Sequence, residues 1–83
     1  MKKLYITCFP FKFREKEIRE LFEKYGKVER VEFFSDFKNA TFESYAYVHM
    51  NDKGAILAIN SLDGIQIETK YLKIYEFRKP RAI

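Results

Sequence analysis

The sequence is poor in cysteine, histidine, glycine and proline, and each scarcity excludes a class of protein. Its single cysteine, Cys8, cannot form an internal disulfide, and one cysteine with one histidine is too few for a tetrahedral zinc site. Three glycines and two prolines leave no low-complexity or linker-like stretch. We therefore expect an ordered protein in a reducing compartment that needs no disulfide, metal or cofactor.

Long apolar runs are missing as well. The apolar stretch after Lys2 and Lys3 is interrupted by Pro10 and Lys12, and it lacks the small-residue cleavage site of a signal peptide. No run approaches the roughly 20 residues that a membrane-spanning helix needs. We expect a soluble intracellular protein without a membrane partner, cytoplasmic or, in a eukaryotic cell, nuclear.

The length of the chain suits one small globular domain. Its 83 residues, 47% of them hydrophobic, can build one modest core and no second one. We predict a single domain over residues 1–83, with its core in about residues 2–78 and a short basic tail at 78–83. Since strands are expected near both ends, we interpret the chain as a whole single-domain protein, with a domain cut from a larger eukaryotic protein as the alternative.

Positive charge gathers at the two ends of the chain. The net charge is +4, but the middle sums to −2 because the cations cluster at the termini, as Lys2, Lys3, Lys12, Arg78, Lys79 and Arg81. If the first and last strands pair, these clusters merge into one positive rim that suits phosphates. Charged ends that are simply solvated explain the same composition.

Hydrophobic periodicity predicts four strands and two helices. Apolar residues alternate with polar or aromatic ones at 3–7, 28–34, 42–50 and around 72–75, whereas they recur at helical spacing at 15–25 and between the cap at 51 or 52 and residue 62. A loop is expected near 36–41. Asn51 or Asp52 should cap the second helix, Asp63-Gly64 should end it, and Gly26 should end the first helix in a left-handed conformation.

This order of elements predicts an α+β fold, the ferredoxin-like β-α-β-β-α-β sandwich. Two helices with one apolar stripe each can cover only one face of a four-stranded antiparallel sheet, so the other face meets water. The first and third strands lie in the middle of this topology and place Tyr5, Tyr45 and Tyr47 together at the centre of the open face. Phe34, Tyr75 and Phe77 are expected toward its edges.

Several exposed rings on one face of a sheet indicate a binding surface. Each ring left in water lacks the stabilisation of roughly 1.5 to 3 kcal/mol that burial of its side chain would give. Nucleobases are flat, and stacking on an aromatic side chain is worth about 1 to 3 kcal/mol per base. The open face is therefore a candidate surface for single-stranded nucleic acid.

Two segments resemble the signature motifs of the RNA recognition motif family. Leu4–Phe9 resembles the family's hexamer, and Glu43–Met50, about forty residues later, resembles its octamer. Residues 18–28 and 58–64 resemble its framework, so the likeness covers nearly the whole chain. It implies single-stranded RNA binding in which Tyr5 and Tyr47 stack on two successive bases and Tyr45 packs against the sugars between them.

The sequence departs from the family at positions that contact phosphate. Glu43 stands where the octamer begins with Arg or Lys, so an attractive contact becomes repulsive. Ser44 replaces the usual Gly, Met50 the last aromatic residue, and Cys8 the common Asn. The stacking residues are intact, but the phosphate contacts must come from other cations, and the sequence leaves open whether Glu43 abolishes or only weakens RNA binding.

The candidate RNA-binding residues combine exposed aromatic side chains with nearby cations: Tyr5, Phe34, Tyr45, Tyr47, Tyr75, Lys3, Lys73, Arg78, Lys79 and Arg81. Single-stranded DNA is an alternative ligand because stacking does not sense the 2′-hydroxyl. Base choice would fall to edge residues such as Phe34, Lys73, Tyr75 and His49, although His49 is also consistent with an ordinary solvated strand residue.

The main alternative is a protein-interaction module on the same fold. Ile56 and Leu57 lie off the apolar stripe of the second helix, where they could dock a partner or form a weak homodimer, and the sheet aromatics could also bind protein. Isolated apolar surface residues are, however, common. Phe9, Phe11 and Phe13 are expected to pack under the first helix rather than form a docking loop.

Catalysis is not expected. Cys8 and Arg14 have the spacing of the phosphate-binding loop of cysteine-dependent phosphatases, but that loop needs small residues whose N–H groups converge on phosphate. Bulky rings and a proline intervene here. Acylphosphatases share the order of elements, but their glycine-rich first loop is missing.

Overall fold

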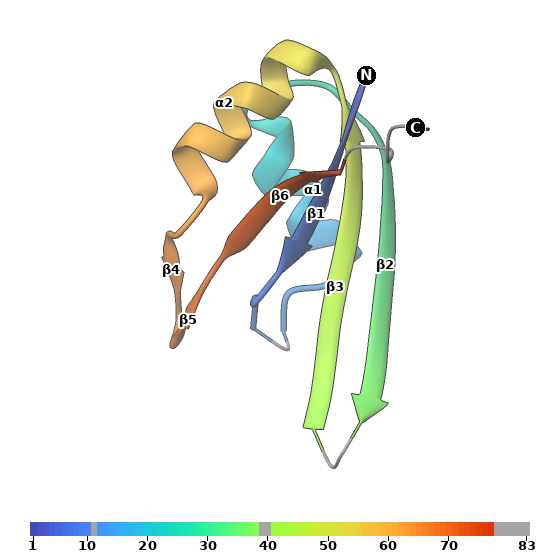
Figure 1. Ribbon diagram of the computed structural model, residues 1–83, viewed down its shortest axis with the longest axis vertical. Coiled ribbons are helices and arrows are strands. Elements are labelled where there is room, and N and C mark those ends of the chain that lie inside the picture. Colours follow the sequence, from blue (N-terminus) through green and yellow to red (C-terminus); the bar gives the residue numbers. More distant parts are fainter. Residues whose placement is uncertain (11, 39–40, 78–83) are drawn as a thin grey trace, which may run out of the picture.

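The structure, a computed structural model, describes residues 1–10, 12–38 and 41–77, with the side chains of 37–38 and 41–43 outside this description. Its elements are β1 (Lys2–Thr7), α1 (Glu15–Glu23), β2 (Val28–Lys38), β3 (Thr41–Met50), α2 (Asp52–Leu62), β4 (Gln66–Ile67), β5 (Lys70–Tyr71) and β6 (Lys73–Phe77). In Figure 1, α1 lies behind the four-stranded sheet and α2 lies at the upper left, next to β6. The predicted ferredoxin-like arrangement is confirmed.

The sheet has the predicted order, β2-β3-β1-β6, and every pairing in it is antiparallel. β1 and β3 are therefore central, and β6 lies against β1, with Lys3 opposite Phe77. The two ends of the described chain are thus neighbours in the sheet. Arg78, Lys79 and Arg81, predicted to extend this rim, lie outside the described residues.

The core fills the space between the sheet and the helices, as the alternating pattern predicts. Leu4 and Ile6 of β1 and the inward residues of β3 are fully buried, together with Ile18, Phe22, Ala55 and Ala58 from the helices. Phe9 is also buried, and Phe13 packs against the core. The expectation that these rings pack inside is confirmed for both, whereas Phe11 lies outside the described residues.

Both ends of α2 lie where the sequence predicted them. The side chain of Asn51 accepts a hydrogen bond from the backbone N–H of Gly54 at 2.9 Å, which satisfies one free donor of the first turn. Gly64 adopts a left-handed backbone, with φ of +83°, just after the helix ends. Among the described residues, no helix is long and apolar enough to cross a bilayer.

The prediction for Gly26 is wrong. Its φ is not among the positive values in the described chain, and the C-cap of α1 is Lys24 in an ordinary helical conformation. Gly26 instead lies against α2: a Cβ atom at Gly26 would stand 2.7 Å from the Cα of Gly54. Glycine is needed here because two backbones touch, not because a helix has to turn.

The predicted loop at 36–41 is shorter in the structure. β2 continues to Lys38 and β3 begins at Thr41, so the two strands form a long hairpin that projects past the rest of the sheet (Figure 1). The predicted loop begins at Asp36, and Asp is depleted in strands. The backbone pairing of the hairpin overrides this preference, since Ser35 pairs with Ser44 and Asp36 with Glu43.

A second, two-stranded sheet was missed. β4 and β5 pair between α2 and β6, and Glu68 turns between them with φ of +57°. Strands of two residues are too short to show a period of alternation, so the pattern carried no signal for them.

Candidate nucleic-acid interface

Register across the sheet arranges the open face in rows that run from β2 through β3 and β1 to β6. The first row, nearest the projecting hairpin, contains Phe34, Tyr45, Thr7 and Lys73; the second contains Glu32, Tyr47, Tyr5 and Tyr75; the third contains Arg30, His49, Lys3 and Phe77. Because side chains alternate between faces along each strand, all of these lie opposite the helices. The first two rows are therefore largely aromatic, while Glu32, Arg30 and His49 form a polar corner on β2 and β3.

The rings form one continuous surface, here called the aromatic platform, made of Tyr5, Phe34, Tyr45, Tyr47, Tyr75 and Phe77. Tyr5 is at its centre, with ring centroids 5.5 Å from Tyr47, 5.9 Å from Tyr45 and 6.2 Å from Tyr75. Phe34 stacks on Tyr45 at 5.2 Å, and Phe77 meets Tyr47 edge to face at 6.1 Å. These are ordinary separations for aromatic pairs, so the rings hold one another in place.

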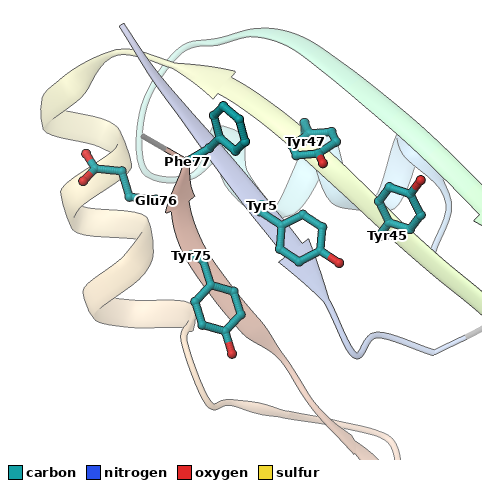
Figure 2. A pocket seen from close by; sticks show the side chains of 6 residues that line it. All are labelled: Tyr5, Tyr45, Tyr47, Tyr75, Glu76 and Phe77. Atoms are coloured by element: carbon teal, nitrogen blue, oxygen red, sulfur yellow. The ribbon is translucent and has the colours of Figure 1, made fainter. Parts of the chain in front are cut away.

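The platform surrounds a shallow hollow of about 560 Å³. Figure 2 shows the rings of Tyr5, Tyr45, Tyr47, Tyr75 and Phe77 standing on the sheet side by side, whereas Glu76 points away from them. The volume lies within the range of small-ligand sites, roughly 300 to 1,000 Å³. The hollow can therefore admit planar groups the size of a base.

Polar side chains border the platform on the β2 side. Glu32 Oε1 lies 2.6 Å from His49 Nε2, and Glu32 Oε2 lies 3.3 Å from a guanidinium nitrogen of Arg30. An ionised carboxylate only accepts, so Nε2 of His49 carries the proton of this hydrogen bond. That hydrogen bond, helped by the charges of Arg30, His49 and Lys3, holds the pKa of the Glu32 carboxyl below its usual value against a smaller desolvation effect.

Lys3 lies directly over two rings. Its Nζ atom is 4.4 Å from the ring centroid of Tyr47 and 4.7 Å from that of Phe77. Such cation–π contacts are worth about 0.5 to 1 kcal/mol at exposed sites, so the ammonium can leave the rings at small cost. A base that stacks on this side of Tyr47 has to displace it.

The structure brings together most of the sequence-predicted site. Tyr5, Tyr45 and Tyr47 are central and Phe34 and Tyr75 flank them, while Lys3 and the exposed Lys73 share the same face. The side chain of Glu43 and residues Arg78, Lys79 and Arg81 lie outside the described part.

Phe77, Arg30 and Glu32 lie on this face but were not among the predicted RNA-binding residues. Alternation places Glu32 on the open face, but its contact with His49 depends on the register between β2 and β3, which the pattern of one strand does not give.

The structure also describes residues on which the protein-interaction and phosphatase alternatives depend. Ile56 and Leu57 are exposed, at 52% and 48%, on the helix that lies behind the sheet. Between Cys8 and Arg14, Phe9 is buried and Phe13 packs on the core. Within the described ranges, no three His, Cys, Asp or Glu side chains gather into a metal-binding group.

The fold and the open aromatic face define an RNA-binding class of domain, and sequence comparison agrees. The family model for the RNA recognition motif matches residues 4–73. The chain belongs to the RNA recognition motif family.

Relatives with known descriptions are similar over most of this chain. A probable arginine/serine-rich splicing factor 3 of Caenorhabditis elegans is 28% identical over 74 residues, which cover 88% of this chain and 27% of the relative. The chain thus spans about a quarter of that protein.

Solved structures show the same fold. An RNA-binding protein named PG1 superposes with a TM-score of 0.81 and 20% identity, covering 98% of this chain and all of that one. The RNA recognition domains 1 and 2 of Sex-lethal from Drosophila melanogaster give a TM-score of 0.79 and 25% identity, covering 96% of this chain and 51% of that one.

Proposed function

We propose that this domain binds a short single-stranded RNA across its open face. Tyr5 and Tyr47 stack on two successive bases, and Tyr45 packs against the sugars between them. Phe34, Tyr75 and Phe77 extend the platform toward the edges of the sheet. The observation that carries the proposal is the continuous aromatic platform on the face that the helices do not cover.

The distribution of exposure supports this function. Phe34, Tyr75 and Phe77 are 41%, 53% and 47% exposed on a single face. Scattered apolar residues are normal on protein surfaces, but a contiguous patch marks a binding surface. A stack of bases suits it better than a globular partner because each ring offers a flat face of the size of a base.

Cations for the phosphates are available on the same face. Lys3 leaves the ring of Tyr47 when a base takes its place, and Lys73 is exposed at the β6 edge. Lys2 is less available because it pairs with Glu76 on the other side of the sheet. We infer that Lys3 and Lys73, joined by Arg78, Lys79 and Arg81, replace the phosphate contact that the octamer position of Glu43 lacks.

Replacing Tyr47 with alanine tests the proposal. Tyr47→Ala removes one stacking ring and should weaken binding of a single-stranded RNA by roughly 1 to 3 kcal/mol. Fluorescence anisotropy with a labelled RNA hexamer measures the change. The fold should persist, because the ring of Tyr47 lies opposite the core.

Tyr71→Ala is the matched control. Tyr71 is 59% exposed and belongs to the β4–β5 sheet rather than to the platform, so its loss should leave affinity unchanged. Equal RNA affinity in Tyr47→Ala, Tyr5→Ala and wild type would exclude stacking on this face. Equal binding of RNA and of DNA of the same sequence would show that single-stranded nucleic acid in general is the ligand.

A further inference from the structure

The polar border of the platform has unused hydrogen-bonding capacity next to a stacking ring. Glu32 lies directly opposite Tyr47 in the pairing of β2 with β3. Side chains opposite each other on one face of an antiparallel pair are neighbours, with Cβ atoms about 4.5 to 5.5 Å apart. A base that lies on Tyr47 therefore brings one of its edges toward the carboxylate of Glu32.

The carboxylate can accept more hydrogen bonds than the protein gives it. Oε1 accepts from His49 and Oε2 faces Arg30, whereas an ionised carboxylate offers about four acceptor positions. The side chain of Glu32 is 24% exposed, so the remaining positions reach solvent. Its two partners also fix the orientation of the carboxylate, which is the condition for recognising a particular edge.

We propose that Glu32 selects guanine for the base that stacks on Tyr47, an inference that rests on the proposed RNA-binding function. The Watson–Crick edge of guanine carries two adjacent donors, N1–H and the N2 amino group, which match the two oxygens of a carboxylate. Adenine and cytosine offer one amino donor beside a ring nitrogen that accepts. Uracil places its one donor between two carbonyl oxygens, which the carboxylate repels.

A neighbouring cation fits the same base. Guanine has the acceptor O6 next to N1, and a donor for it lies beside Glu32: a guanidinium nitrogen of Arg30 is 3.3 Å from Oε2. The border thus presents acceptors and donors in an order that complements one edge of guanine. In single-stranded RNA these edges are free to be recognised.

A purely structural role of Glu32 makes a different prediction. If its carboxylate only ties β2 to β3 through His49, its loss affects all bases alike. Base preference therefore separates recognition from support, and it is the property to measure.

The experiment compares RNA hexamers of uridine in which one central position is guanosine, adenosine, cytidine, inosine or uridine. Wild type should bind the guanosine hexamer about five- to a hundred-fold more tightly than the uridine hexamer, the range expected for one bidentate contact. Inosine lacks the N2 amino group, so replacing guanosine by inosine should cost wild type several-fold in affinity. Fluorescence anisotropy measures each dissociation constant.

Two variants with the same change in charge complete the test. Glu32→Gln should lose the preference for guanosine and bind guanosine and inosine equally. Glu20→Gln, at an exposed position of α1 behind the sheet, should keep the wild-type preference. If Glu32→Gln does not fold, the comparison of guanosine with inosine in wild type decides the question.

Equal affinity of wild type for the guanosine, inosine and uridine hexamers would overturn the inference. A guanosine preference that survives in Glu32→Gln would overturn it too. In either case binding that still depends on Tyr47 leaves the proposed function standing, whereas the absence of binding to every hexamer overturns both.

Discussion

At the scale of single residues, the open face combines rings that stack with side chains that carry charge. The hydrogen bond between Glu32 and His49, 2.6 Å long, joins β2 to β3 at the border of the platform. Because this bond and the nearby cations favour the ionised carboxylate, the pKa of Glu32 is lower in the folded protein than in the unfolded chain. The pair therefore stabilises the fold in a pH-dependent way.

The loss of this stabilisation in acid can be measured. A carboxyl whose pKa is lowered on folding contributes stability above its ordinary value of 4.5 and loses it as the pH falls through the lowered value. We predict that the free energy of unfolding falls more steeply in wild type than in Glu32→Gln as the pH decreases from about 5 to about 3. Urea unfolding at several pH values measures it, and parallel pH curves for the two proteins would contradict it.

At the scale of elements, the contact between Gly26 and Gly54 sets how closely α2 approaches the start of β2. A Cβ atom at Gly54 would stand 2.8 Å from the Cα of Gly26, closer than real Cβ contacts. The backbone of Gly26 cannot turn aside as a long side chain can, and such a Cβ would also press on Oδ1 of Asn51, the atom that caps the helix. The two glycines therefore allow the helix to pack at this distance.

The substitution Gly54→Ala compares two opposing effects of this glycine on stability, its low helix propensity and its close contact with Gly26. Helix propensity alone predicts that alanine stabilises α2 by about 1 kcal/mol. The close backbone contact predicts the opposite, and we expect a net loss of about 1 to 3 kcal/mol, as for other overpacked sites. Chemical denaturation measures it.

Lys53→Ala is the control for Gly54→Ala, because Lys53 occupies the same first turn of α2 but is exposed. Its substitution should change stability by no more than about 0.5 kcal/mol. A Gly54→Ala variant more stable than wild type would show that α2 and Gly26 are not in tight contact.

How far the sequence predicts the fold depends on the range of the interactions. The alternation of apolar and polar residues identified the inward and outward residues of β1 and β3. This pattern can be read within each strand alone, because every strand has one face in the core. The role of Gly26 could not be predicted, since it depends on a helix that follows more than twenty-five residues later in the sequence. The loop between β2 and β3 was predicted too long for a related reason: pairing between the two strands outweighs the low strand preference of Asp36.

The same reasoning applies to the site. The tyrosines could be predicted because their positions follow from alternation and from the resemblance of two segments to family motifs. The bond of Glu32 to His49 could not, because it depends on which residue of β2 lies opposite which residue of β3. Base preference depends on this register, so it becomes predictable only with the structure.

At the scale of the whole molecule, the two faces of the sheet serve different purposes. Core side chains and both helices occupy one face, while the platform and its polar border occupy the other. Ile56 and Leu57 are exposed on α2 and so belong to the covered side. Any contact that they make with a partner protein should be independent of RNA.

Leu57→Ser tests this separation without changing the net charge. We predict unchanged affinity for a single-stranded RNA hexamer, because the substitution lies on the opposite side of the sheet from Tyr5 and Tyr47. Sedimentation of both proteins at high concentration would show in addition whether Leu57 supports self-association. Weaker RNA binding by Leu57→Ser with its fold intact would contradict the division between the two faces.

Direct mapping of the bound RNA tests the proposal that the open face is the binding surface. The amide chemical shifts of the isotope-labelled protein would be followed while a single-stranded RNA hexamer is added. We predict that the largest changes fall on β1 and β3, around Tyr5, Tyr45 and Tyr47, with little change in α1 and α2. Changes confined to the helices, or none at saturating RNA, would contradict it.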